Sequence, residues 1–170
     1  PYTKVQLYGG FYEGPTRTPK MRSWSGEARP NFGVNFSDRR KLGQWDVTNG
    51  FAVNYDKGYL DSSSGGDFRI NNKFRWRAKK IEGLNMGLNT LIYYSYGTTV
   101  FIWDSIGNRG YKPMPGTITH SNNWRIMIDP FISYYDKKDN RYSYKMRYLN
   151  SSNINSTGQG AIGQMIFNEF

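Results

Sequence analysis

The chain has 170 residues, of which 37% are hydrophobic and 17% aromatic, so one packed domain is expected and global disorder is disfavoured. Its net charge of +10 and pI near 9.7 indicate an anionic partner, either nucleic acid, anionic lipid or an acidic small ligand. It has no cysteine and one histidine, His120, which excludes disulfide frameworks, thiolate metal sites and multi-histidine metal sites. We expect His120 to be a solvated side chain.

Apolar and polar residues alternate along eight segments, with the period of two that predicts half-buried β-strands. In chain order the segments are Lys4–Tyr12, Asn31–Ser37, Gln44–Tyr55, Phe68–Ala78, Leu84–Tyr96, Trp124–Tyr135, Arg141–Asn150 and Gly160–Phe170. The alternation is clearest in Gln44–Tyr55 and weakest in the last segment. Several segments have about ten residues or more, the length that a tilted strand needs to cross a bilayer. The sequence therefore predicts an all-β fold of antiparallel up-and-down strands.

The predicted connections alternate in length. Short polar turns are expected at Asp38–Gly43, Lys79–Gly83 and Asp136–Asn140, each with a cationic and a turn-forming residue. Longer links, rich in Gly, Pro, Ser and Asn, are expected at Glu13–Pro30, Asp56–Asp67, Gly97–Asn123 and Ser151–Gln159. Within the last link, Ser151–Thr157 is polar enough to be a mobile loop. Short turns at one end and long loops at the other are typical of an outer-membrane β-barrel.

Aromatic residues gather on the apolar face of the predicted strands, mostly near strand ends. They are Trp45, Trp76, Tyr94, Tyr96, Trp124, Tyr134, Tyr142 and Tyr148. Aromatic girdles at the two interfaces of a membrane would place them there. The alternative is a soluble β-sandwich with the aromatics in its core, although sandwich strands are usually shorter and rarely so basic on their outer face.

The opposite face of the strands carries a row of basic residues. The row consists of Arg69, Lys73, Arg75, Arg77, Arg125, Arg141, Lys145 and Arg147. Charge on the lipid face of a barrel costs about 2–4 kcal/mol near the midplane, so these side chains are predicted to line the barrel lumen. There they attract an anionic solute or an acidic partner, or they face water and are offset by carboxylates. Platforms for single-stranded nucleic acid place aromatics and cations on one face, so no nucleic-acid partner is expected here.

Three other patterns are weak predictors of chemistry. The stretch Gly158–Gly163 reads GQGAIG, but it leads into an alternating segment and not into the helix that a dinucleotide site needs. Asp46, Asp129 and Glu169 lie on different strands, and we expect each to pair with arginine. The loop Asp61–Asp67 lacks the glutamate and spacing of an EF-hand and is expected to be a flexible tip. No catalytic residue, cofactor or metal is predicted.

Several ordered patches resemble the barrel of TonB-dependent outer-membrane receptors of the Bacteroidetes type. They are KIEGLNMGLN (Lys80–Asn89), VFIWDS (Val100–Ser105), YKPMPGT (Tyr111–Thr117), IDPFISYYDKKDNR (Ile128–Arg141) and MRYLNSSN (Met146–Asn153). The resemblance runs from about Arg69 to the end of the chain and is less secure before it.

Such receptors close a barrel of about 22 strands with a plug, and they import siderophores, cobalamin, glycans or peptides. This sequence has eight predicted strands and no recognisable plug or TonB box, so the resemblance implies one segment of the barrel wall in a Gram-negative outer membrane. The implied partners are outer-membrane lipid, a solute of anionic character, the TonB complex through parts outside this chain, and a surface lipoprotein. The segment Gly97–Asn123, with Phe101, Trp103, Tyr111 and His120, is then an extracellular loop facing the ligand.

Two further interpretations stay open. Eight strands are enough to close a complete small outer-membrane barrel, and the chain ends in an aromatic residue, Phe170. The other interpretation is a soluble basic β-protein that binds an anionic polymer. The chain starts at Pro1 without a signal-peptide pattern, so we expect a mature form or a piece of a longer protein.

Overall fold

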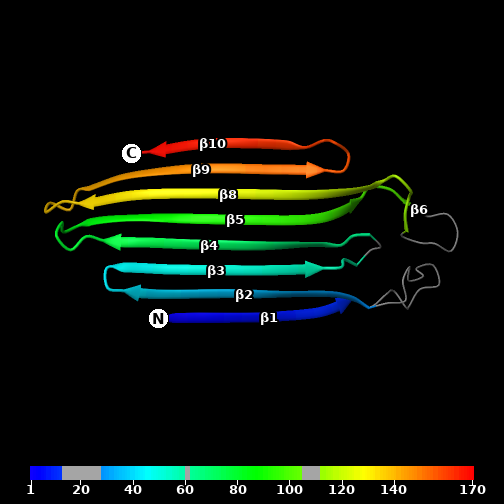
Figure 1. Ribbon diagram of the computed structural model, residues 1–170, viewed down its shortest axis with the longest axis horizontal. Helices are drawn as coiled ribbons and strands as arrows, with labels where there is room; N and C mark the ends of the chain where they lie inside the picture. Colours follow the sequence, from blue (N-terminus) through cyan, green and yellow to red (C-terminus); the bar gives the residue numbers. More distant parts are fainter. Residues whose placement is uncertain (13–27, 60–61, 105–111) are drawn as a thin grey trace.

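The computed structural model describes residues 1–12, 28–59, 62–104 and 112–170, and within them every regular element is a β-strand (Figure 1). The eight long strands are β1 (Tyr2–Tyr12), β2 (Arg29–Leu42), β3 (Trp45–Asp56), β4 (Gly65–Arg77), β5 (Leu84–Val100), β8 (Ile118–Tyr135), β9 (Arg141–Asn155) and β10 (Ala161–Glu169). A small hairpin of β6 (Trp103–Asp104) and β7 (Lys112–Pro113) lies in the link between β5 and β8. The described part of the chain therefore contains no helix that could span a membrane.

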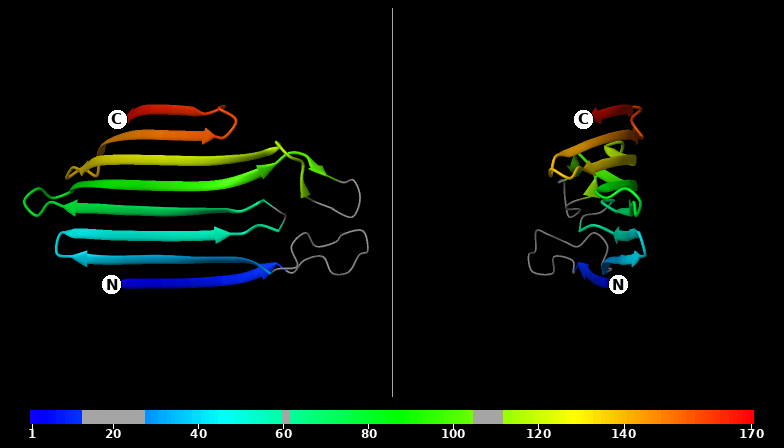
Figure 2. Two further views of the ribbon diagram at one scale, coloured as in Figure 1. Left: turned by 45° about the vertical axis from the view of Figure 1, so that its right-hand side comes forward. Right: turned by 90° about the vertical axis from the view of Figure 1, so that its left-hand side faces the viewer.

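The eight long strands form one antiparallel up-and-down sheet. Its order is β1-β2-β3-β4-β5-β8-β9-β10, so every strand pairs with its neighbour in the chain. The sheet is not closed, because β1 and β10 lie at opposite edges (Figure 1). The end-on view in Figure 2 shows the strands stacked in a single layer. The predicted all-β, up-and-down arrangement of eight strands is confirmed at this level.

Several strands are longer than the alternation predicted. β5 runs to Val100 and β8 begins at Ile118, so ten of the 27 residues of the predicted loop 97–123 continue the sheet. The prediction of a mobile loop at Ser151–Thr157 was wrong, because β9 extends to Asn155 and only residues 156–160 connect it to β10. The Asn155 side chain orders this connection: its Oδ1 accepts hydrogen bonds from Thr157 N and Gln159 N, at 3.2 and 2.9 Å.

The register places apolar residues on one face of the sheet. Residues directly opposite each other on antiparallel strands point to the same side, and Phe36 lies opposite Phe51, Phe51 opposite Ile70, and Ile70 opposite Ile92. All eight aromatic residues singled out in the sequence share this face, as the pairs Trp45–Trp76, Tyr94–Trp124 and Tyr134–Tyr142 illustrate. We call it the apolar face. It also carries an internal polar pair, in which Asn72 Nδ2 donates to Thr90 Oγ1 at 3.5 Å.

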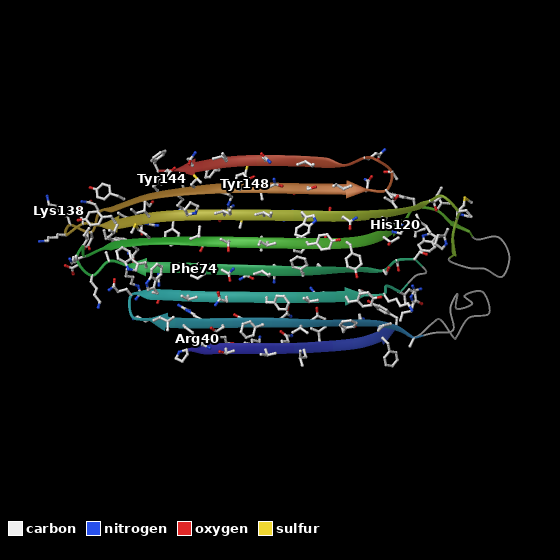
Figure 3. All side chains as sticks on the ribbon, in the orientation of Figure 1. Arg40, Phe74, His120, Lys138, Tyr144 and Tyr148 are labelled. Atoms are coloured by element: carbon white, nitrogen blue, oxygen red, sulfur yellow. The ribbon has the colours of Figure 1, made fainter. Side chains whose placement is uncertain are left out.

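Nothing in the described chain covers the apolar face. Leu7 on this face is 72% and Trp45 48% exposed, and the one buried hydrophobic residue of the described chain, Ala52, lies on the opposite face next to Arg69. Figure 3 shows side chains along the whole length of every strand, with Lys138 near one end of the sheet and His120 near the other. A soluble sandwich would need a second sheet on this face, and the described residues supply none.

The apolar zone runs diagonally across the strands. On β2 it covers alternate positions from Pro30 to Phe36, and on β9 alternate positions from Tyr142 to Tyr148. The cross-strand row through Phe36 continues through Phe51, Ile70, Ile92 and Ile126 to Asn150. Asn150 is the first polar residue beyond the apolar zone of β9, so the apolar zones of β2 and β9 have no cross-strand row in common. Outside these two zones, β2 and β9 carry single apolar residues on this face only near the strand ends.

The turn between β8 and β9 is organised by one carboxylate. Asp136 Oδ1 accepts hydrogen bonds from Lys138 N at 2.8 Å and Asn140 N at 2.9 Å, and its Oδ2 accepts from Asn140 Nδ2 at 2.8 Å. These hydrogen bonds, chiefly the one from the Asn140 side chain, hold the pKa of Asp136 below its ordinary value of 3.8. Asp139 follows with a φ of 60°, a conformation that aspartate tolerates better than most residues.

We predict that this turn loosens in acid. The lowered pKa in the folded state means that Asp136 stabilises the turn above pH 3.8, and that this contribution is lost as the pH falls through the folded pKa. Amide proton shifts of Lys138 and Asn140, followed by NMR between pH 6 and pH 2, should titrate together. The turn at Asn155 is the internal control, because its acceptor is a neutral amide. Equal pH dependence of the Thr157 and Gln159 amides would contradict the prediction.

Candidate functional site

The eight predicted basic residues lie on the face opposite the apolar face. On β4 the row alternates with the apolar positions, and Arg69 lies opposite Tyr93, which lies opposite Arg125. On β9, Lys145 lies opposite Phe131, and Arg141 lies opposite Tyr135. All eight side chains therefore project from one surface, which we call the basic face.

The sequence alternation missed two cations of this face, Arg39 and Lys41. They fall in the segment Asp38–Gly43, which was predicted to be a turn, but β2 continues to Leu42. Arg39 lies opposite Thr48, and Lys41 opposite Asp46. The signal that could have found them is the spacing itself, since both are in phase with Asn35 and Ser37 on the same strand.

Of the three carboxylates predicted to pair with arginine, Asp46 and Asp129 do so and Glu169 does not. Asp46 Oδ2 accepts from Arg75 Nε at 2.9 Å and from Arg75 Nη2 at 2.5 Å, and it also pairs with Arg77. Glu169 Oε1 accepts from Lys145 Nζ at 3.0 Å, so its partner is a lysine and not the predicted arginine. Asp46 is thus shared by two arginines of the neighbouring strand.

The third ion pair spans an interruption in the backbone ladder. Pro130 has no N–H to donate, and the pairing of β8 with β9 is broken at Asp129 and Pro130. There Arg147 donates from Nε to Asp129 Oδ1 at 2.9 Å and from Nη2 to Oδ2 at 2.7 Å. A bidentate pair of this kind fixes geometry as well as charge, so it holds β8 to β9 where the ladder is interrupted.

A hollow of about 1000 Å³ lies on the basic face towards the end with the short turns. Six cationic side chains line it, namely Arg39, Lys73, Arg75, Arg141, Lys145 and Arg147, against the three carboxylates Asp46, Asp129 and Glu169. The hollow therefore carries an excess of positive charge. Arg69 and Arg125 are on the same face but outside it.

Apolar residues also reach into this hollow. Phe131 and Phe167 line it, although both belong to the basic face by register. Phe131 lies over Gly87, where an added Cβ would collide with the ring, so the absent side chain at Gly87 lets the ring approach the sheet closely. The hollow thus offers both cations and aromatic surface.

The predicted ligand-facing loop is only partly described. The Phe101 side chain is 73% exposed, Trp103 belongs to the small β6–β7 hairpin, and Tyr111 lies outside the described residues. His120 is exposed as expected but sits in β8, where its Nδ1 is 3.2 Å from Thr98 Oγ1 and its N–H donates to Ser156 Oγ at 3.0 Å.

The GQGAIG stretch does not have the surroundings of a dinucleotide site in the described part of the chain. The GQGAIG stretch begins in a turn, where Gly158 has a φ of +76°, and ends in β10. It therefore lacks the helix N-terminus that would meet a pyrophosphate. No group of three or more metal-ligating residues comes together in the described ranges.

Comparison of the chain with protein-family models, curated proteins and solved structures found no match. The geometry of the two faces is therefore the basis for inferring function.

We predict that the bidentate pair contributes more than the exposed lysine pair. Asp129 is 15% exposed and Glu169 52%, so Glu169 is better screened by water. A double-mutant cycle of Asp129→Asn and Arg147→Gln should give a coupling of about 1 kcal/mol, against a few tenths for Glu169→Gln and Lys145→Gln. Urea unfolding of the purified, folded chain measures both coupling energies. Equal couplings would show that the broken ladder gives the first pair no special role.

Proposed function

We propose that this chain forms part of the wall of an outer-membrane β-barrel transporter, with the apolar face in lipid and the basic face towards the lumen. The observation that carries the proposal is a sheet that is apolar on one side, basic on the other and covered on neither. In water, an antiparallel sheet packs its apolar face against a hydrophobic core. In a membrane barrel, the apolar face of the sheet points outward into the lipid.

The diagonal of the apolar zone supports this orientation. From β2 to β9 the zone shifts by eight residues over five strand spacings, which is about 27 Å along the strands and about 24 Å across them. These lengths correspond to strands tilted by about 48° from the membrane normal, slightly above the 35–45° of known barrels. On this reading Asp38 and Arg40, which follow Phe36 on the apolar face of β2, lie at the interface and not in the hydrocarbon.

A barrel larger than eight strands accounts best for the open edges. In the sheet, β1 and β10 are far apart and each presents an unpaired edge, which is a liability in any sheet left as it is. Further strands on both sides would satisfy these edges. A wide, wet lumen also suits the excess of positive charge on the basic face better than a narrow lumen packed with side chains.

The resemblance of Lys80–Asn89 and the following patches to TonB-dependent receptors supports a finer assignment. The chain would be a wall segment of a receptor that imports a siderophore, cobalamin, a glycan or a peptide. Its partners would be outer-membrane lipid, the TonB complex acting through other parts of the protein, and a surface lipoprotein. No catalysis is proposed.

The lipid-facing assignment predicts opposite effects at two adjacent positions of β4. Ile70→Arg places a charge in the centre of the apolar face and should cost about 2–4 kcal/mol in a bilayer. Asn71→Arg places the same charge on the basic face and should cost less than about 1 kcal/mol. Reversible urea unfolding in phosphatidylcholine vesicles measures the free energies. Equal costs would contradict the assignment.

The transporter assignment predicts a large native polypeptide. Outer membranes from the source cells, separated on a denaturing gel with and without boiling, should show the peptide IEGLNMGLNTLIYYSYG in a band several times heavier than 19.7 kDa. A heat-shifting band near 19.7 kDa would instead indicate a complete small barrel, and the TonB-type assignment would fall.

A further inference from the structure

The hollow on the basic face contains three cations that its own carboxylates do not neutralise, and one of them, Arg141, lies over the Tyr135 ring at 6.0 Å. Asp46 pairs with Arg75 and Arg77, Asp129 pairs with Arg147, and Glu169 pairs with Lys145. Among the described residues, Arg39 and Lys73 make no ion pair and no side-chain hydrogen bond. Both side chains line the hollow and belong to exposed residues.

These two cations stand on one cross-strand row. Arg39 lies opposite Thr48, and Thr48 lies opposite Lys73, so a hydroxyl separates the two charges. Two strand spacings place their backbones about 10 Å apart. The row is fixed by continuous pairing of β2 with β3 and of β3 with β4, so the spacing is built into the sheet.

The size and lining of the hollow define what fits it. The volume of the hollow, about 1000 Å³, is at the upper end of the range for small-molecule sites. It is too small to hold a length of polymer. Arginine presents a planar fork that matches carboxylate or phosphate in two hydrogen bonds, whereas lysine acts as a point charge. Phe131 and Phe167 supply apolar surface in the same hollow.

We propose that this hollow binds a small organic polyanion, with one carboxylate or phosphate on Arg39, a second on Lys73 and Thr48 donating between them. The body of the ligand extends from Lys73 towards Phe131, which lies two strand spacings away on β8. This inference rests on the proposed function, because it assigns the chemical class of the solute that the basic face meets. Monovalent anions satisfy one cation only and bind more weakly.

The test uses the whole chain folded into phosphatidylcholine vesicles, with isothermal titration calorimetry as the readout. Citrate probes a carboxylate ligand, pyrophosphate a phosphate ligand, and acetate serves as the monovalent comparison. Saturable binding of citrate or pyrophosphate, with acetate at least tenfold weaker, is the expected result. Which of the two binds more tightly identifies the anionic group.

Substitutions then locate the site. Arg39→Gln and Lys73→Gln should each weaken binding of the better polyanion about tenfold, a loss of about 1.4 kcal/mol. Arg125→Gln is the matched control, since it removes one cation from the same face outside the hollow, and it should change the affinity less than twofold. Equal loss in all three variants would mean diffuse attraction to a basic surface and would overturn the proposal.

Failure of this site is distinguishable from failure of the proposed function. Protease protection of the vesicle-bound chain is measured on the same samples. A chain that inserts in lipid but binds none of the three anions overturns the ligand site and leaves the barrel wall standing. A chain that stays outside the vesicles overturns the barrel wall, and with it the lumenal role of the hollow.

Discussion

Continuous antiparallel register across eight strands is the constraint on which the rest of the structure depends. Because side chains alternate with a period of two, the pairing of Phe36 with Phe51 also decides that Arg39 and Lys73 share the other face. A slip of one residue in any hairpin would move charges onto the apolar face. The separation of the faces, the ion pairs and the hollow all follow from this register.

The apolar face and the basic face require different environments. The apolar face has no covering element in the described chain, and its diagonal zone matches strands tilted in a bilayer. Part of the positive charge on the basic face is neutralised within the sheet, since Asp46, Asp129 and Glu169 each pair with a cation. Other cations of this face have no carboxylate partner, and in our proposal two of those in the hollow, Arg39 and Lys73, bind a soluble ligand.

The strands and their faces could be predicted from the sequence because alternation is a local signal. Trp45–Tyr55 and Phe68–Trp76 show it with a single polar residue on the apolar face of each, Asn49 and Asn72. Strand ends were harder to predict, because polar segments such as Ser151–Asn155 continue a strand only where a partner is available. Arg39 was missed for that reason. The hollow could not be predicted at all, since it depends on Phe131 covering Gly87 and on side chains from strands far apart in sequence.

A cysteine scan of β4 tests the central claim most directly. The chain has no cysteine, so single cysteines at positions 68–77 can each carry one environment-sensitive fluorophore in phosphatidylcholine vesicles. The account predicts strict alternation, with even positions quenched by brominated lipid and odd positions quenched by aqueous iodide. Quenching by iodide at all ten positions, or a scan without a period of two, would contradict it.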